Sequence, residues 1–156
     1  WTPVMNWHLT LKFLGSIEEP KVDEIEFALR RELNLFPRCT ISVKGLGVFP
    51  DTKRPRVLWA GVEGNQLTAL AEAVEGALAP LGFQREERPF RPHLTLGRWR
   101  EGGRAGPELE RELSRWRSFD FGCSAVHSVE LFQSVLTRSG AEYRVLKTVQ
   151  LKSELS

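Results

Sequence analysis

The sequence predicts an α+β fold with a largely antiparallel sheet. Single helical patterns are interspersed with strand patterns that come in hairpin-like pairs, which favours this class over a doubly wound α/β fold. One tetrapeptide also occurs twice in the chain, which indicates two similar halves. With 156 residues, 41% of them hydrophobic, the chain has the size of one domain, or of two small lobes sharing a core, and can fold unaided.

The individual elements follow from local patterns. Strands are predicted where β-branched and apolar residues alternate, and helices where apolar residues recur at intervals of three and four. Ser16 is the predicted N-cap of the first helix, Pro80 and Gly82 end the second, and Pro107 begins the third. The predicted strands are 7–14, 40–48, 56–62, 92–99, 120–135 and 142–151, and the predicted helices are 20–34, 67–78 and 107–116.

Composition and charge exclude several classes of protein. No apolar run approaches the roughly 20 residues of a membrane span, and no leader resembles a secretion signal. Two cysteines, Cys39 and Cys123, cannot form a disulfide framework, so a cytosolic location is expected. A net charge of +2 is too small for a protein that coats nucleic acid. Six of the 16 arginines lie between positions 85 and 104, a basic stretch that suits either a phosphate ligand or a solvated surface.

The repeated tetrapeptide is His-Leu-Thr-Leu, at 8–11 and again at 93–96. Alternate side chains of a strand share a face, so His8 and Thr10 face one way while the leucines between and after them anchor the other face. An imidazole titrates near neutrality, so one histidine can act as general base and its twin as general acid. Threonine hydroxyls and a nearby arginine can donate hydrogen bonds to phosphate oxygens. The two motifs therefore predict metal-free cleavage of a phosphodiester.

Other kinds of site have less support. Metal sites usually need three or four protein ligands, and the two motif histidines have no third His, Cys or carboxylate at a matching position. Neither a metal nor another cofactor is therefore expected. The sequence contains no P-loop, no dinucleotide-binding glycine pattern and no G-x-S-x-G nucleophile motif. His127 has no threonine two positions on, so it is interpreted as structural. The tryptophans, including Trp59, are interpreted mostly as core or rim residues, and Phe49, in a loop, is the best candidate to stack on a base.

Five segments of the chain have a recognisable pattern and order: HLTLKFLG at 8–15, GLGVFPDTKRPRVLWAGV at 45–62, the segment 67–83 with the predicted helix, RPFRPHLTLGR at 88–98 and SVELFQSVLTRSGAEYRVL at 128–146. Together they resemble the 2H phosphoesterases and, within them, the RNA 2′,3′-cyclic phosphodiesterases, also called 2′-5′ RNA ligases. The resemblance implies two pseudo-symmetric lobes with the active-site cleft between them. It also implies hydrolysis of RNA 2′,3′-cyclic phosphate ends to 2′-phosphomonoesters, with reversible 2′-5′ ligation.

The resemblance also assigns roles to residues. It implies that His8 is the proton donor and His93 the proton acceptor, and that Thr10 and Thr95 hold the phosphate. Arg98 matches a phosphate-binding position, although its odd offset from His93 points it away on a regular strand, so a bulge or strand end is needed there. The further substrate-binding candidates are Arg91, Phe49 and the motif leucines Leu9, Leu11, Leu94 and Leu96.

The chain departs from the family pattern at its start, where only seven residues precede His8. Residues 1–156 are therefore expected to form one such domain that lacks the family's first strand and helix. The expected partners are RNA or oligonucleotide ends with a 2′,3′-cyclic phosphate, and nucleotides, with no membrane, and a monomer is expected. Two alternatives stay open: a nucleotide- or RNA-binding 2H module without turnover, and a 2H phosphodiesterase that acts on another small phosphodiester.

Overall fold

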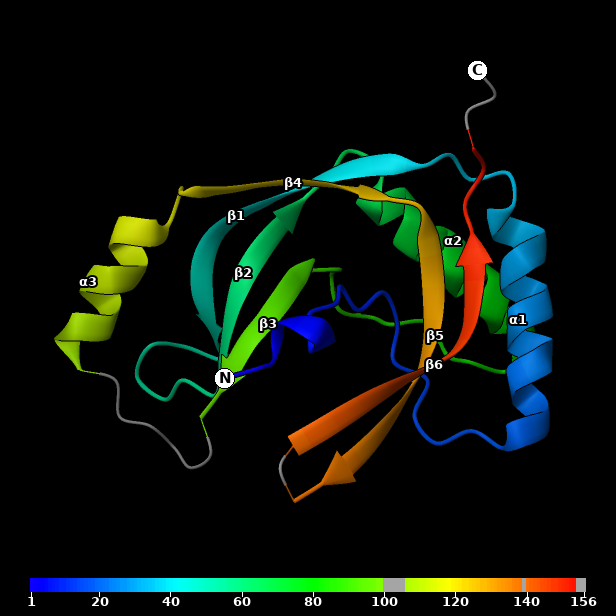
Figure 1. Cartoon of the computed structure of the whole chain (residues 1–156), viewed down its shortest axis with the longest axis horizontal. Helices are drawn as coiled ribbons and strands as arrows, with labels where there is room; N and C mark the ends of the chain where they lie inside the picture. Colours follow the sequence, from blue (N-terminus) through cyan, green and yellow to red (C-terminus); the bar gives the residue numbers. More distant parts are fainter. Residues whose placement is uncertain (100–105, 139, 154–156) are drawn as a thin grey trace. The chain divides into compact units, whose positions relative to one another are not determined.

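The computed structural model describes residues 1–99, 106–138 and 140–153. Its mixture of helices and antiparallel strands confirms the predicted α+β class. The elements are a 3-10 helix η1 (Val4–Asn6), α1 (Glu19–Leu33), β1 (Cys39–Phe49), β2 (Val57–Glu63), α2 (Leu67–Leu78), a 3-10 helix η2 (Ala79–Leu81), β3 (His93–Arg98), α3 (Pro107–Trp116), β4 (Asp120–Val126), β5 (Ser128–Thr137) and β6 (Gly140–Gln150) (Figure 1).

The chain forms two compact units, each assembled from three separate segments. The first unit consists of Trp1–Thr10, Ile41–Gly64 and Arg91–Ser124, and the second of Leu11–Thr40, Asn65–Phe90 and Ala125–Ser156. Among the described residues, no helix combines the length and the apolar character that crossing a membrane requires. Both motif histidines belong to the first unit, so its sheet determines their arrangement.

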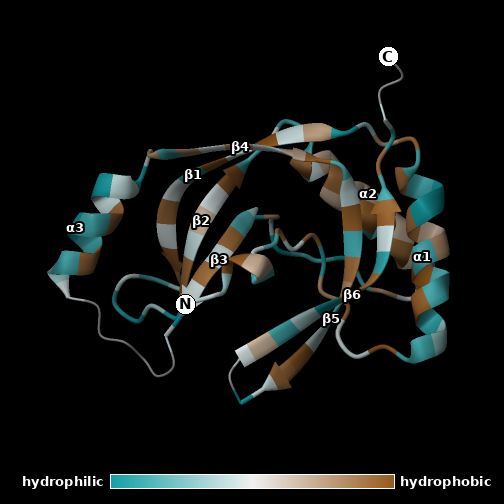
Figure 2. Cartoon of the chain, in the orientation of Figure 1, coloured by the Kyte–Doolittle hydropathy of each residue, from teal (hydrophilic) through white to brown (hydrophobic). Residues whose placement is uncertain are grey.

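The sheet of the first unit has the strand order β3-β2-β1-β4. β2 pairs antiparallel with both β1 and β3, and polar and apolar residues alternate along His93–Leu96 of β3 (Figure 2). The N-terminal segment lies beside β3, where the amide of Thr2 donates to the carbonyl of Leu96 at 2.9 Å (Figure 1). Farther along, Leu9 forms an antiparallel bridge with Leu94. The first motif is therefore held against the outer side of β3.

The second unit contains the principal hydrophobic core. Apolar residues at helical spacing on α1 and α2 face each other and the β5–β6 hairpin, which is the arrangement expected of two amphipathic helices. Lys12 and Glu75 form an ion pair at 2.7 Å inside this unit, with both side chains largely buried. The buried core residues are Ile25, Leu29, Leu33, Leu70, Val74, Ala77, Leu78, Leu131, Val149 and Leu151.

The predicted strand at 7–14 is wrong. Only Leu9 is bridged there, and the backbone that follows has no regular strand pairing. The chain passes from the first unit to the second after Thr10, and Leu11 then packs against the core of the second unit. Alternating side chains suited the segment to a strand, but a strand also needs a partner along its whole length.

Two predicted boundaries are also corrected. Ser16 is not the N-cap of α1, because the helix begins at Glu19 with Pro20 in its first turn. Proline is suited to that turn by its fixed φ, so Pro20 sets the start of the helix. The predicted strand at 120–135 is two strands, β4 and β5, separated at His127, whose carbonyl accepts from the amide of Leu151 at 2.9 Å. The remaining predicted helices and strands are confirmed, with small shifts at some ends.

Candidate active site

The two His-Thr pairs lie on neighbouring segments of the first unit. In an antiparallel pair whose bridge joins Leu9 to Leu94, His8 lies opposite Thr95 and Thr10 lies opposite His93. Directly opposite residues share a face, so all four side chains project from the same side of the sheet. The two histidines are diagonal neighbours, which puts their Cα atoms about 7–8 Å apart. That separation leaves room for a phosphate group between the two imidazoles.

Each imidazole is held in the same way by its own backbone. The Nδ1 atom of His8 lies 2.8 Å from the carbonyl oxygen of Asn6, and Nδ1 of His93 lies 2.7 Å from that of Arg91. A carbonyl oxygen can only accept, so Nδ1 carries the hydrogen in both rings. Proton exchange with a ligand then takes place at Nε2 of each ring, on the side turned away from the backbone.

A β-bulge in β3 decides the direction of Arg98. Thr95 pairs with Trp59, but the next residue of β2, Leu58, pairs with Gly97, so Leu96 is the extra residue of the bulge. The pairing then continues with Arg98 opposite Val57. Because β2 itself is regular here, Arg98 lies on the same face as Thr95. The bulge therefore turns Arg98 toward the face of the histidines, which a regular strand does not allow.

Aromatic rings cover this face beside His93. The ring of Phe49 lies edge-on to the His93 ring, with centroids 5.1 Å apart, and the centroids of Phe49 and Trp59 are 5.2 Å apart. The indole of Trp59 lies across Gly47, where any Cβ atom would collide with it. Its buried Nε1 has no hydrogen-bond partner among the described residues, so packing alone holds the ring. Gly61, opposite His93, adds no side chain to this crowded face.

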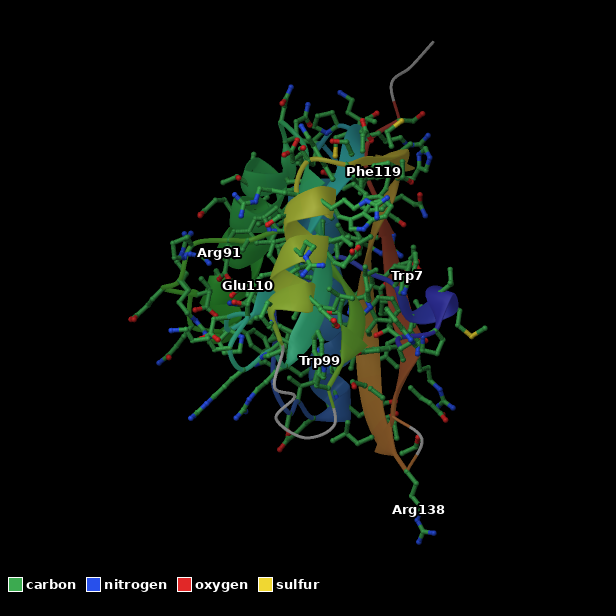
Figure 3. All side chains as sticks on the ribbon, turned by 90° about the vertical axis from the view of Figure 1, so that its left-hand side faces the viewer. Trp7, Arg91, Trp99, Glu110, Phe119 and Arg138 are labelled. Carbon is green, nitrogen blue, oxygen red and sulfur yellow. The ribbon has the colours of Figure 1, made fainter. Side chains whose placement is uncertain are left out.

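The remaining predicted residues have different positions. Leu9 and Leu94 lie on the opposite face from the imidazoles, by the alternation of the strands. Leu11 packs against the core of the second unit. These positions help to hold the motif segments in place, and contact of the three leucines with substrate stays a prediction. Leu96 occupies the bulge, and Arg91, labelled in Figure 3, contributes its carbonyl to His93 while its side chain is exposed.

Several contributors to the site were not predicted from the sequence. The carbonyl groups of Asn6 and Arg91 carry no sequence signal, because every residue has a carbonyl. Trp59 is half-buried, as a core or rim residue would be, but its ring also lies beside the rings of Phe49 and His93. Gly47 and Gly61, on the strand beside Trp59 and two positions after it, are a signal that could have indicated a large ring lying on glycine.

Taken together, one sheet face carries two imidazoles with the same tautomer, two hydroxyl groups and one guanidinium. Such a set can take a proton on one side of a phosphate, deliver a proton on the other and donate hydrogen bonds to the oxygens between. Within residues 1–99, 106–138 and 140–153, no three His, Cys, Asp or Glu side chains are grouped as metal ligands would be. The predicted cleft between two lobes stays a prediction.

Several known proteins have sequences similar to this chain. Residues 5–131 match the family model of the 2′-5′ RNA ligase superfamily. The chain is 39% identical over 150 residues to the RNA 2′,3′-cyclic phosphodiesterase of Aeropyrum pernix, covering 95% of this chain and 84% of that protein. It is also 39% identical over 154 residues to the RNA 2′,3′-cyclic phosphodiesterase of Aquifex aeolicus, covering 97% of this chain and 81% of that protein.

Solved structures have a similar fold. TT0787 of Thermus thermophilus matches with a TM-score of 0.81 and 27% identity, over 99% of this chain and 82% of that chain. E. coli LigT complexed with 3′-AMP matches with a TM-score of 0.72 and 28% identity, over 96% of this chain and 79% of that chain. The resemblance predicted from the motifs is thereby confirmed, and the chain belongs to the 2′-5′ RNA ligase superfamily.

Proposed function

We propose that this protein hydrolyses RNA 2′,3′-cyclic phosphate ends to 2′-phosphomonoesters by metal-free acid–base catalysis with two histidines. The observation that carries the proposal is the pairing of the two motifs across the Leu9–Leu94 bridge, with both imidazoles bonded through Nδ1 to a backbone carbonyl. The names of the Aeropyrum and Aquifex relatives support the substrate class. The free thiols Cys39 and Cys123 support a cytosolic site of action.

The proposed reaction begins at His93. Its Nε2 takes a proton from water as the water oxygen bonds to phosphorus. The bond from phosphorus to the 3′-oxygen breaks, and that oxygen takes a proton from Nε2 of His8. The product has a 2′-phosphate and a 3′-hydroxyl, and the two histidines return to their starting states by exchanging protons with solvent. The Nδ1–H bonds keep both rings oriented in either protonation state.

Phosphate oxygens gain negative charge during this reaction. The hydroxyls of Thr10 and Thr95 are on the imidazole face and can donate to the non-bridging oxygens. Arg98 is on the same face beyond the bulge and can bind two oxygens at once through its planar guanidinium. We place the nucleoside against Phe49, whose ring is packed beside His93. Donors of this kind contribute most where charge develops, so they act on the rate as well as on binding.

The same residues allow ligation. If a 5′-hydroxyl of a second RNA takes the place of water, His93 takes its proton, the 5′-oxygen bonds to phosphorus, and His8 protonates the leaving 3′-oxygen, which forms a 2′-5′ linkage. Cleavage of that linkage back to the cyclic phosphate is the reverse step, in which microscopic reversibility gives each histidine the opposite role. Ligation is therefore part of the proposal as a second outcome at one site.

The test is the product formed from a nucleoside 2′,3′-cyclic phosphate, identified by phosphorus NMR with and without EDTA. The wild type is expected to form the 2′-phosphate in both conditions, and His8→Ala and His93→Ala to form almost none. His127→Ala is the matched control, because His127 belongs to the second unit and alanine keeps the backbone carbonyl that accepts from the amide of Leu151. Tight nucleotide binding without turnover would favour the binding-module alternative. A 3′-phosphate product would reverse the proposed leaving group, and activity lost in EDTA and restored by a divalent ion would contradict the metal-free mechanism.

A further inference from the structure

The loop between β1 and β2, residues 50–56, carries cations that the proposed reaction does not use. Lys53 and Arg54 are exposed, and neither forms an ion pair with any residue that the structure describes. The acid of the same loop, Asp51, bonds instead to the backbone, accepting from the amides of Lys53 and Arg54 at 2.8 and 2.9 Å. Both cationic side chains therefore project from a turn that Asp51 shapes.

This β1–β2 loop is an ordered structure. The hydroxyl of Thr52 donates to the carboxylate of Glu110 on α3 at 2.7 Å, and Figure 3 labels Glu110 on that helix. The amide of Arg56 donates to the carbonyl of Phe49 at 2.7 Å and closes the loop at its base. Pro55 is fully buried. A ligand that binds Lys53 and Arg54 thus meets a backbone that is already in place, which lowers the entropy cost of binding.

The β1–β2 loop leaves the sheet at the end where Arg98 lies. Phe49 pairs with Val57, and Val57 pairs with Arg98, so these three residues form one row across the sheet. His93 lies five positions before Arg98 along β3, and the Phe49 side chain of that row extends toward it, with ring centroids 5.1 Å apart. The face thus presents His93, then Thr95, then Arg98, with the loop cations beyond the end of β3.

We propose that the β1–β2 loop binds the phosphate backbone of the RNA strand upstream of its cyclic end, through Lys53 and Arg54. The inference rests on the proposed function, because an RNA whose cyclic phosphate lies between the histidines carries its other phosphates away from that end. Arg98 then contacts the reacting phosphate, and the loop contacts phosphates on the 5′ side. An acidic protein could also be attracted by two cations, but only the RNA strand is covalently joined to the reacting group.

The test compares two substrates that differ only in length: a nucleoside 2′,3′-cyclic phosphate and a six-nucleotide RNA with the same cyclic end. For the Lys53→Ala/Arg54→Ala double variant, kcat/KM on the RNA is expected to fall about tenfold, with the nucleoside changed less than twofold. Two phosphate contacts on single-stranded RNA correspond to a salt slope of about 1.4. Raising the salt fourfold should thus lower the wild type's preference for the RNA about sevenfold, and leave the variant's almost unchanged.

Arg56→Ala is the matched control, an exposed cation of the same loop. The carbonyl of Arg56 accepts from the amide of Trp99 at 3.0 Å, one position beyond the Val57–Arg98 pair, so its side chain points to the opposite face. We expect its kcat/KM on both substrates to stay within twofold of the wild type. Equal losses on both substrates in the double variant, or no loss on either, would overturn the proposal.

Binding provides a readout that does not depend on turnover. Fluorescence anisotropy of a labelled six-nucleotide RNA should show weaker binding to the double variant than to the wild type and to Arg56→Ala. If the wild type cleaves neither substrate, the proposed function fails, while this binding difference still decides whether the loop contacts RNA. Equal competition by an RNA and by an acidic peptide of the same charge would overturn the assignment to RNA.

Discussion

The two copies of His-Leu-Thr-Leu have the same local geometry but different backbone support. The second copy lies in β3, which pairs with β2 along most of its length. The first copy has a single bridge, Leu9 with Leu94. Yet each histidine bonds through Nδ1 to the carbonyl two residues before it. The local motif therefore orients the imidazole, and the surrounding structure only has to bring the two copies side by side.

The largest expected effects come from removing either histidine, and their pH dependence distinguishes the two copies. His8→Ala and His93→Ala should each lower kcat by about 10²–10⁴-fold. A general base must be unprotonated, so His93→Ala should lose the acidic limb of the bell-shaped profile of kcat/KM, whereas His8→Ala should lose the alkaline limb. Profiles of residual activity measure this directly. Exchanged limbs would reverse the roles, and a complete bell in either variant would remove that histidine from the proton transfers.

A large effect on stability is expected from a change at Lys12, which follows the first His-Leu-Thr-Leu motif where the chain enters the second unit. Two residues after Thr10, the ammonium group of Lys12 bonds to Glu75 and to the carbonyl of Gln84, both at 2.7 Å. Lys12→Met leaves the Glu75 carboxylate largely buried without its partner, which should lower the free energy of unfolding by about 3–5 kcal/mol. Urea unfolding measures this change. The double variant Lys12→Met/Glu75→Leu should recover much of it, and an unchanged midpoint in Lys12→Met would show that the pair does not anchor the segment.

The motif residues were easier to predict than the long-range contacts that position them. His8, Thr10, His93 and Thr95 followed from a repeat and from strand alternation, which are local properties. The direction of Arg98 depends on a register shift relative to β2, so alternation alone pointed it to the wrong face. The strand predicted at 7–14 failed for a related reason, since its pairing partner is remote in sequence.

The contact between the Trp59 ring and Gly47 is a second long-range feature, and the effect predicted from it is smaller. Gly47→Ala places a methyl group against the indole, which should shift the rings of Phe49 and His93 that rest on it. We expect overpacking to cost about 1–3 kcal/mol of stability. At the same time, kcat should fall and KM should rise, each severalfold, because the variant displaces both His93 and the Phe49 ring against which we place the nucleoside. Steady-state kinetics and urea unfolding measure the two effects.

Two further variants separate displacement of Trp59 from general disruption of the sheet. A methyl group at Gly97, in the same sheet, meets Trp1 only at 3.5 Å, an ordinary contact, so Gly97→Ala should retain kcat. Adding Trp59→Phe to Gly47→Ala makes room for the methyl group and should restore part of the lost rate. If Gly97→Ala lowers kcat as much as Gly47→Ala does, a specific role of the contact between Trp59 and Gly47 is contradicted.

The smallest predicted effect concerns an ion-pair network that is more exposed than the Lys12–Glu75 pair. Lys147 bonds to Asp23 at 2.8 Å and to Glu26 at 2.7 Å, and these bonds raise the pKa of Lys147. Hydrogen bonds from Lys147 and Arg30 lower the pKa of Glu26 below its ordinary 4.5. Glu26 therefore contributes stability that is present above pH 4.5 and is lost as the pH falls through its lowered pKa. Lys147 contributes stability that is present below pH 10.5 and is lost as the pH rises through its raised pKa.

Urea midpoints of the wild type and of Lys147→Met test this network across pH. The two proteins should differ by a constant amount between pH 4.5 and 10.5, and the difference should shrink below and above that range. Because the network is more exposed than the Lys12–Glu75 pair, added salt should reduce the difference, whereas the cost of Lys12→Met should resist salt. Equal salt sensitivity of the two variants would mean that burial does not distinguish the two ion pairs. The segment after the first motif would then be anchored by its apolar contacts, such as Leu11, rather than by Lys12.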